Sequence, residues 1–231
     1  MRSSSLFFRI LLKPSTHRVA GRLVVGRCRS NRPEDGRFTR AEVKDLVEDA
    51  WRIFADLEPH LAAQPTVGSR LNVKLACLTL AFFHALLKHG LERTYAIRTI
   101  ADLTWAFYAK WGALGRLLGG RGVITHFGSL KPGEVVPLLF PFNPPGYIAK
   151  WVPGDRSVAY DVVHCPVAEF FRGHGAADLC VSSWCNLDFP LAEMLGQKLS
   201  REKTLVLGDD RCTFRWIPLA PKSSNLEGDQ R

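Results

Sequence analysis

The chain has 231 residues, enough to bury the core of one domain, and its 46% apolar and 23% charged residues are ordinary for a globular protein. Eight of the 31 Lys and Arg residues fall within residues 1–33, which contain no Asp or Glu, so the remainder carries 23 basic against 22 acidic residues. The net charge of +9 therefore belongs to the N-terminal segment, and the balance elsewhere argues against a basic surface for nucleic acid.

Six cysteines without secretory spacing predict reduced thiols in a cytoplasmic protein rather than a disulfide scaffold. No run of about 18 uncharged apolar residues occurs, so we expect no membrane span. The most apolar segment, 71–87, contains Asn72, Lys74 and His84 and is interpreted as a buried helix.

Residues 1–37 form a basic leader that is rich in Arg, contains Ser and lacks acids before Glu34. This composition is typical of a mitochondrial transit peptide, which would place the mature protein in mitochondria. It also fits a disordered basic arm or translation from an upstream start. On either interpretation, we expect the leader to be disordered or cleaved and to lie outside the fold.

Three helices are predicted in the N-terminal half. The first follows a capping-box pattern, Thr39 with Glu42, and its apolar residues repeat at helical spacing as far as Pro59. The second, 70–88, is apolar nearly all round and should be central to the core. The third covers 92–118.

The C-terminal half predicts short strands and helices. In chain order these are a β-hairpin (147–152 and 157–163), a short helix opening at Cys165-Pro166, a helix from Asp178 to Leu195 that Pro190 kinks or divides, and two strands (203–207 and 212–217). The expected fold is α+β, with a helical N-terminal half packed on a small antiparallel sheet with two short helices. We expect a single domain at 38–219 and a disordered tail at 220–231.

The candidate functional residues are three cysteines and an aspartate near the C-terminal end. Cys185 and Asp188 are three residues apart and should share one helix face. Cys165 opens a helix, whose N-terminus should lower the pKa of its thiol. Cys212 begins the last strand. Cys180 lies about 140° round the helix from Cys185, so we expect it to point elsewhere.

Three interpretations of these residues stay open. The thiolates of Cys165, Cys185 and Cys212, with or without the carboxylate, could hold a metal such as zinc. One cysteine could be a nucleophile with a carboxylate partner, and the cysteines could simply pack in the core. His164 and His174 could replace a ligand or serve as a base. The cofactor is thus either absent or a metal with Cys ligands.

The C-terminal half resembles the L-2-amino-thiazoline-4-carboxylic acid hydrolase-like family. The matching pattern is a hairpin strand leading into Cys165, then Cys185-x-x-Asp188, Thr204-Leu205 with Gly208, and Cys212-x-Phe214. Helices upstream also look similar, so the resemblance extends over roughly residues 70–217. Where the family often has Asp between the last Cys and Phe, this chain has Thr213.

The resemblance implies hydrolysis of a cyclic amidine-type C–N bond in a small sulfur heterocycle that bears a carboxylate, giving an N-carbamoyl-cysteine-like product. Such chemistry needs an activated water or thiolate and a proton donor for the departing group. On this basis Cys165 or Cys185 is assigned as the nucleophile or a metal ligand, and Asp188 as the acid/base or an orienting group. Cys212 would be a further ligand or a thiol of the pocket. Arg211 or Arg215 would bind the substrate carboxylate.

Two other functions fit the same pattern. Helices on a small sheet with three scattered cysteines are similar to vinyl-reductase-type domains, which implies a non-catalytic sensor of a metal or small molecule. A degenerate scaffold is the third alternative. The expected partner is a small-molecule substrate or ligand, and the sequence does not indicate an oligomeric state.

Overall fold

The computed structural model describes residues 2–24, 38–117, 142–153, 158–194 and 196–218, with side chains described from residue 8 onward and only as far as residue 109 in the fourth helix. The N-terminal half contributes α1 (Arg2–Ala20), η1 (Gly21–Leu23), α2 (Arg40–Leu57), η2 (Glu58–His60), α3 (Val67–Lys88) and α4 (Arg93–Leu117). The C-terminal half contributes β1 (Ile148–Trp151), β2 (Val158–His164), α7 (Pro166–Gly173), α8 (Ala177–Ser183), η4 (Cys185–Leu187), α9 (Asp188–Met194), β3 (Gln197–Ser200), η5 (Leu205–Leu207) and β4 (Cys212–Pro218).

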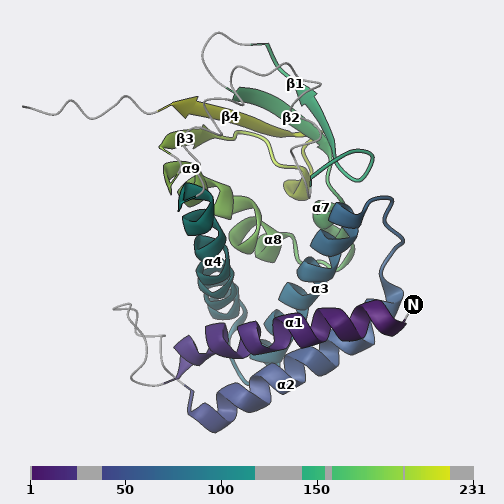
Figure 1. Cartoon of the computed structure of the whole chain (residues 1–231), viewed down its shortest axis with the longest axis vertical. Coiled ribbons are helices and arrows are strands. Elements are labelled where there is room, and N and C mark those ends of the chain that lie inside the picture. The colour runs from purple at the N-terminus through teal and green to yellow at the C-terminus, as the bar shows by residue number, and fades with distance from the viewer. Residues whose placement is uncertain (1, 25–37, 118–141, 154–157, 195, 219–231) are drawn as a thin grey trace, which may run out of the picture.

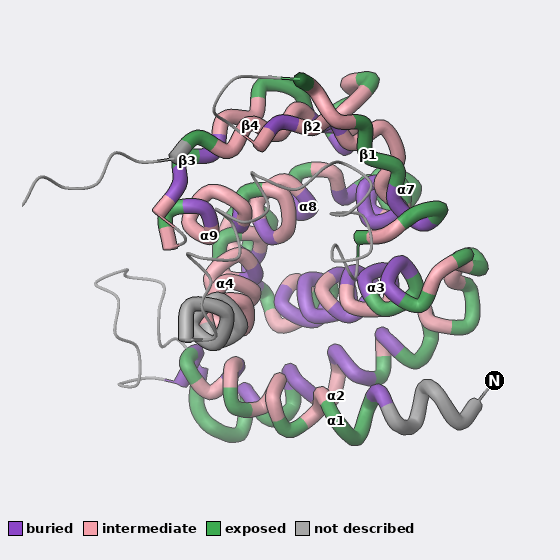
Figure 2. The backbone as a smooth tube through the Cα atoms, turned by 45° about the horizontal axis from the view of Figure 1, so that its top comes forward, coloured by how far each residue is buried: buried purple, intermediate pink, exposed green. Residues whose placement is uncertain are grey.

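These elements form layers (Figures 1 and 2). Helices α1 and α2 lie side by side at one end, α3 and α4 follow, α7 to α9 come next, and the sheet closes the opposite end. Helix α7 packs against α3, α8 against α4, and α9 against β3. The α+β class predicted from the sequence is confirmed, with the short helices lying between the long helices and the sheet.

The N-terminal segment differs from the expected disordered leader. Phe8 is buried, stacks on Phe54 of α2 at 5.6 Å between ring centroids, and meets the edge of Trp51 at 6.5 Å. Trp51 Nε1 donates a hydrogen bond to Thr16 Oγ1 at 3.0 Å, and Lys13 forms an ion pair with Glu48. Residues 2–24 therefore belong to the folded helical layer. Proteolytic removal of the leader stays a prediction, and residues 25–37 lie outside the described ranges.

The predicted N-terminal caps explain where the helices begin. At α2 the Thr39 side chain accepts the Glu42 N–H and the Glu42 carboxylate accepts the Thr39 N–H, as the capping-box pattern predicts. Helix α3 begins three residues before the predicted start, because Thr66 and Ser69 form a second capping box. Gly146 fits closely over this cap, since a Cβ there would lie 2.6 Å from Ser69 Cβ.

Helix α3 is the central core helix, as predicted. Its Cys77, Ala81 and Leu86 side chains are fully buried, and burial raises the pKa of the Cys77 thiol to about 12. Among the described helices, α3 is the one long and apolar enough to span a bilayer, and most of that apolar stretch is covered by the protein itself. This burial is what a core helix shows.

The sheet has four antiparallel strands in the order β1-β2-β4-β3. The predicted hairpin and last strand are confirmed as β1, β2 and β4, although the hairpin turn at 154–157 lies outside the described residues. Tyr160 pairs with Phe214, their rings stack at 5.1 Å, and Trp216 Nε1 donates to Tyr160 Oη. These aromatic side chains occupy the same sheet face as Cys212, because side chains two residues apart along a strand share a face.

The strand predicted at 203–207 is wrong. Besides β2, the strand that pairs with β4 is β3, Gln197–Ser200. The apolar run after Thr204 forms a tight turn, in which the Thr204 N–H donates to Asp209 Oδ2 and Gly208 adopts a left-handed φ of 101°. A glycine allows that conformation without steric cost. The tail predicted at 220–231 is outside the described residues.

Candidate active site around Cys185, Asp188 and Arg201

The three predicted cysteines come from three elements between α8 and the sheet. Cys165 is the N-cap of α7, Cys185 opens η4, and Cys212 begins β4. The charges of Cys185 and Cys212 both contribute to the pKa of Cys165, after the larger effect of burial. The three thiols therefore lie within electrostatic reach of one another, and their convergence on one point stays a prediction.

Cys180 also belongs to this cluster, contrary to expectation. Its Sγ lies 3.9 Å from Cys185 Sγ. The helix that starts at Ala177 ends at Ser183, and Trp184 has non-helical angles (φ −125°, ψ −63°) before the 3₁₀ turn begins at Cys185. The angular argument assumed a continuous helix, and the break at Trp184 turns Cys185 back toward Cys180. Pro190 does not make this break, since it lies in the first turn of α9.

The contact between the two sulfurs makes Cys185 the more acidic thiol. Cys180 is 1% exposed, whereas Cys185 is half-buried and lies nearer the guanidinium of Arg201. The hydrogen bond from the Cys180 thiol lowers the pKa of Cys185, and the charge of Arg201 lowers it further, against opposing effects of desolvation and Asp188. The same hydrogen bond, together with burial, raises the pKa of Cys180. We therefore assign Cys180 as the donor and Cys185 as the acceptor of this contact.

We expect mild oxidation to join Cys180 and Cys185. One equivalent of hydrogen peroxide would convert the two thiols to a disulfide with release of two waters, and the sulfurs need close only from 3.9 Å to about 2.05 Å. Peptide mapping by mass spectrometry should find a loss of about 2 Da confined to the peptide with both residues. In the Cys180→Ser variant Cys185 should instead form sulfenic and sulfinic acid. A disulfide to Cys165 or Cys212 would contradict the prediction.

Arg201 organises the site and was missed by sequence reasoning. Its side chain is 4% exposed. The guanidinium donates to the Cys185 carbonyl at 2.7 Å and to Asn186 Oδ1 at 3.0 Å, and it forms an ion pair with Asp188 at 3.3 Å. It also lies over the rings of Phe189 and Phe214, at 4.9 and 5.7 Å from the centroids. No motif marks Arg201 in the sequence, because its role depends on the η4 turn folding back against the sheet.

Arg201→Met should destabilise the fold by about 2–4 kcal/mol, because it leaves Asp188 without its cation and the η4 carbonyl without its donor. Urea denaturation measures this loss, and the same variant should alkylate more slowly at Cys185 at pH 7, since the thiol pKa rises. Arg172→Met, at an exposed arginine of α7, is the matched control and should change stability by less than about 0.5 kcal/mol. Equal effects of the two substitutions would contradict the role of Arg201 in holding Asp188 and the Cys185 carbonyl.

Asp188 begins α9 and has an unusual proton affinity. Desolvation raises its pKa to about 7, and the opposing effect of Arg201 is smaller. The side chain keeps 32% of its surface accessible, so a ligand can reach it. Its charge also raises the pKa values of Tyr108 and Tyr160, after the larger effect of burial on each, which places both phenols near the carboxylate. Near neutral pH, Asp188 therefore exists partly as the acid.

Cys165 and Cys212 are neutral thiols. Cys165 caps α7 and accepts the Ala168 N–H at 3.4 Å, as a helix N-terminus predicts, but burial raises its pKa to about 12. The expected lowering is thus wrong in sign, because desolvation outweighs the helix N-terminus. Cys212 accepts the Leu205 N–H at 3.2 Å, and burial raises its pKa to about 11. Both thiols line the cluster without being activated.

Arg211 and Arg215 lie away from the cysteines. Both bind Asp161 of β2, whose side chain is on the sheet face opposite to Tyr160 and Phe214. Burial alone would raise the pKa of Asp161, but hydrogen bonds from Arg215 and Arg211 bring it below its usual range. The geometry does not bring these arginines to the thiols.

His164 and His174 are also engaged elsewhere. His164 Nδ1 lies 3.0 Å from Glu169, and His174 Nδ1 lies 2.8 Å from the Phe170 carbonyl oxygen. Across the described part of the chain, no group of three or more His, Cys, Asp or Glu side chains is arranged to hold a metal ion. The donor set around Cys185 thus lacks the closeness of a tetrahedral zinc site.

Thr213, the departure from the family pattern, has a structural role. Its hydroxyl accepts the backbone N–H groups of Glu202 and Lys203 at 3.0 and 3.1 Å, which fixes the segment after β3. An aspartate could accept the same two bonds. Thr213 pairs with Asp161 across the strands, so it belongs to the face that carries Arg215 rather than to the thiol face.

Comparison with protein families finds one match in this half of the chain. Residues 149–216 match the family model described as L-2-amino-thiazoline-4-carboxylic acid hydrolase. The matched segment runs from β1 to β4 and carries the four clustered cysteines with Asp188 and Arg201. It covers less than a third of the chain and leaves out the upstream helices that the expected resemblance included. The searches of curated proteins and of solved structures give no match.

Proposed function

We propose that the protein is a hydrolase that opens a small cyclic amidine or thiazoline carboxylate at Cys185. The family match of residues 149–216 is the premise. One observation carries the proposal: an acidic thiol and a carboxyl group with a pKa of about 7 are held by the same buried guanidinium. A nucleophile and a proton donor poised near neutral pH are the two groups that this reaction needs.

The bond that breaks follows from the product. An N-carbamoyl-cysteine-like product keeps both nitrogens on the former amidine carbon, so the ring opens at its C–S bond and not at the C–N bond named from the sequence. In the first step the Cys185 thiolate adds to that carbon, the ring sulfur leaves, and Asp188 gives it a proton. An S-linked isothiourea remains on Cys185. Water then adds to the same carbon, the bond to Cys185 breaks, and the carbamoyl product and the free thiol result.

Arg201 replaces Arg211 and Arg215 as the residue that we assign to the substrate carboxylate. Its Nε is buried without a hydrogen-bond partner among the described residues. An ionised oxygen that reached it would satisfy this donor and complete a charge-assisted hydrogen bond. The same cation would keep Cys185 in its thiolate form, so one residue would position both reactants.

The thiol pair favours this enzymatic function over the metal-sensor alternative. A sensor of zinc requires several ligands around one ion, whereas among the described residues no three His, Cys, Asp or Glu side chains are so arranged and Cys185 is the clustered thiol whose pKa is lowered. One activated thiol among neutral neighbours is suited to nucleophilic attack.

The test is turnover by the purified full-length protein. It is incubated with L-2-amino-thiazoline-4-carboxylate and with a panel of cyclic amidines and lactams that bear a carboxylate, and mass spectrometry follows the gain of one water. We expect ring opening of the thiazoline, lost in Asp188→Asn and kept in Cys77→Ala, a buried thiol of α3 outside the cluster. A wild-type protein that opens no member of the panel would overturn the proposal.

Asp188 predicts a decline of both activity and stability with rising pH. The folded protein holds this proton up to about pH 7, whereas an unfolded aspartate has its ordinary pKa of 3.8, so the folded state binds more protons between these values. The free energy of unfolding should therefore fall as pH rises through that window, and kcat should fall above about pH 7 as the acid is lost.

Thermal unfolding of wild type and Asp188→Asn, together with kcat of the wild type, measures both effects at pH 5 and pH 8. The asparagine cannot titrate, so the variant should lose the part of the pH dependence that Asp188 supplies. Glu193→Gln, on the same helix, is the control and should keep the wild-type profile. Identical profiles for wild type and Asp188→Asn would contradict the prediction.

A further inference from the structure

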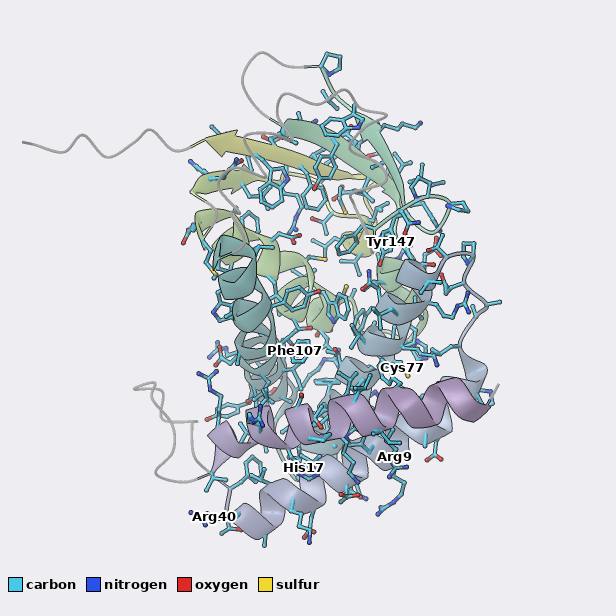
Figure 3. All side chains as sticks on the ribbon, viewed as in Figure 1. Arg9, His17, Arg40, Cys77, Phe107 and Tyr147 are labelled. Carbon is cyan, nitrogen blue, oxygen red and sulfur yellow. The ribbon has the colours of Figure 1, made fainter. Side chains whose placement is uncertain are left out.

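A cavity with a volume of about 110 Å³ is lined by three helices, α1, α3 and α4, and by Trp184, which follows α8. The residues that define its walls include Leu12 of α1, Leu78 and Phe82 of α3, Phe107 and Tyr108 of α4, and Trp184. Figure 3 shows Phe107 between α4 and α3, above the α1 helix in that view. Three helices and Trp184, from distant parts of the sequence, thus contribute to one cavity.

The lining is mainly apolar, and the hydroxyl groups of its threonines are occupied within the protein. Thr79 donates to the Leu75 carbonyl and accepts from Trp184 Nε1, and Thr104 donates to the Ile100 carbonyl. Thr16 donates to the Lys13 carbonyl and accepts from Trp51 Nε1. Among the described residues that line the cavity, none is charged. An ion placed there would lose its hydration without compensation, so the chemistry selects a neutral apolar group.

Two residues connect this cavity to the Cys185 site. Trp184 forms part of its wall and directly precedes Cys185, and the hydrogen bond from its indole to Thr79 fixes the ring. Tyr108 lines the cavity as well, and the charge of Asp188 contributes to its raised pKa. The cavity therefore lies next to the proposed catalytic pair.

We propose that this cavity binds a neutral apolar group about the size of a benzene ring, carried as a substituent by the heterocycle that reacts at Cys185. The assignment of this group to a substrate of Cys185 rests on the proposed function, whereas the binding of an apolar group in the cavity does not. The volume supports this size, because an apolar cavity of about 150 Å³ in another protein stays dry and accepts benzene. The preferred substrate is then an aryl- or alkyl-substituted thiazoline or cyclic amidine.

Binding is tested with fluorobenzene and the full-length protein, followed by ¹⁹F NMR. We expect saturable binding to wild type, weakened at least about 10-fold in Leu78→Phe, whose added ring fills the cavity. Leu12→Phe fills it from α1 and serves as a second variant, in case Leu78→Phe fails to fold. Leu71→Phe makes the same change at an exposed position of α3 outside the lining and should bind as wild type does.

The outcomes separate this inference from the proposed function. Absence of saturable binding to wild type, or equal binding by the folded filling variants, would overturn the cavity site. If fluorobenzene binds as expected but no cyclic amidine is opened, the cavity stands and the proposed reaction fails. If the thiazoline is opened, a phenyl-substituted analogue should have a kcat/KM at least about 10-fold higher than the parent, and Leu78→Phe should remove that advantage. A lower kcat/KM for the analogue would overturn the substrate assignment.

Discussion

Replacing Cys185 by serine is expected to lower kcat for a thiazoline carboxylate at least about 1,000-fold, because a hydroxyl at neutral pH is a far weaker nucleophile than a thiolate. The structure supplies the reason for choosing this thiol. Cys185 is half-buried, receives a hydrogen bond from Cys180, and lies beside the Arg201 guanidinium, so its pKa is lowered while those of the neighbouring thiols are raised. Product formation at saturating substrate, followed by mass spectrometry, measures the loss.

The other cysteines provide graded controls for this experiment. Cys180→Ser keeps a donor next to Cys185 and should lower kcat only about 10-fold. Cys165→Ser and Cys212→Ser remove neutral thiols and should leave most of the activity. Iodoacetamide should label Cys185 first in the wild type, with a rate that reports its lowered pKa. Turnover by Cys185→Ser within 10-fold of wild type would remove this thiol from the mechanism, and selective loss in Cys165→Ser would transfer the role there.

Trp51→Ala is expected to lower the free energy of unfolding by about 3–5 kcal/mol, the range for large aromatic side chains truncated in a core. Trp51 is fully buried between α1 and α2. Its ring makes T-shaped contacts with Phe8 and Phe54, and its indole donates to Thr16. The substitution would therefore remove ring contacts, open a cavity and remove the hydrogen bond that the Thr16 hydroxyl accepts.

Urea denaturation followed by circular dichroism measures this change. Trp105→Ala, at a half-buried position of α4, makes the same truncation and should cost about 1 kcal/mol. Trp51→Phe keeps the ring contacts and loses the hydrogen bond, so an intermediate loss is expected. A cost below about 1 kcal/mol for Trp51→Ala would mean that α1 does not pack on α2 in solution.

The sequence was sufficient to predict the elements whose pattern involves only neighbouring residues. The capping box of Thr39 and Glu42 marks the start of α2, and the alternation around residues 147–163 marks the hairpin, because each pattern depends on neighbouring residues. The run at 203–207 shows the limit of such patterns. Its apolar residues are equally compatible with a strand and with a turn, and only the Asp209 side chain and the left-handed Gly208 decide between them.

The candidate site was predictable as far as the cysteines and Asp188, and no further. The position of Cys180 depends on the two dihedral angles of Trp184, which no periodicity indicates. Arg201 became buried because the η4 carbonyl, Asn186 and Asp188 surround it, and these partners meet only in the tertiary structure. The pKa of Cys165 shows the converse, since a correct local expectation about a helix N-terminus was outweighed by burial in the folded chain.

The composition of residues 1–37 was a poor guide to the structure of residues 2–24. A basic, acid-free segment predicts a leader, but an amphipathic helix with one apolar face has the same composition. Phe8, Ala20 and Leu23 supply such a face, and α2 offers the buried surface that receives it. Such a helix joins the fold only if another part of the chain offers an apolar surface for it to pack against. The sequence of the helix alone does not show whether that surface exists.

The interlocking of α7 and α8 with α3 and α4 bears on how the protein can be divided for expression. The segment 149–216 matches a family model by itself, yet Phe171 and Leu179 are fully buried, α7 packs against α3, and α8 packs against α4. The Trp184 indole and the Asp178 carboxylate reach back to Thr79 and Arg93 of the long helices. Cut free, this segment would present a continuous apolar face to water, so the family signature is not an autonomous folding unit and aggregation is its expected fate.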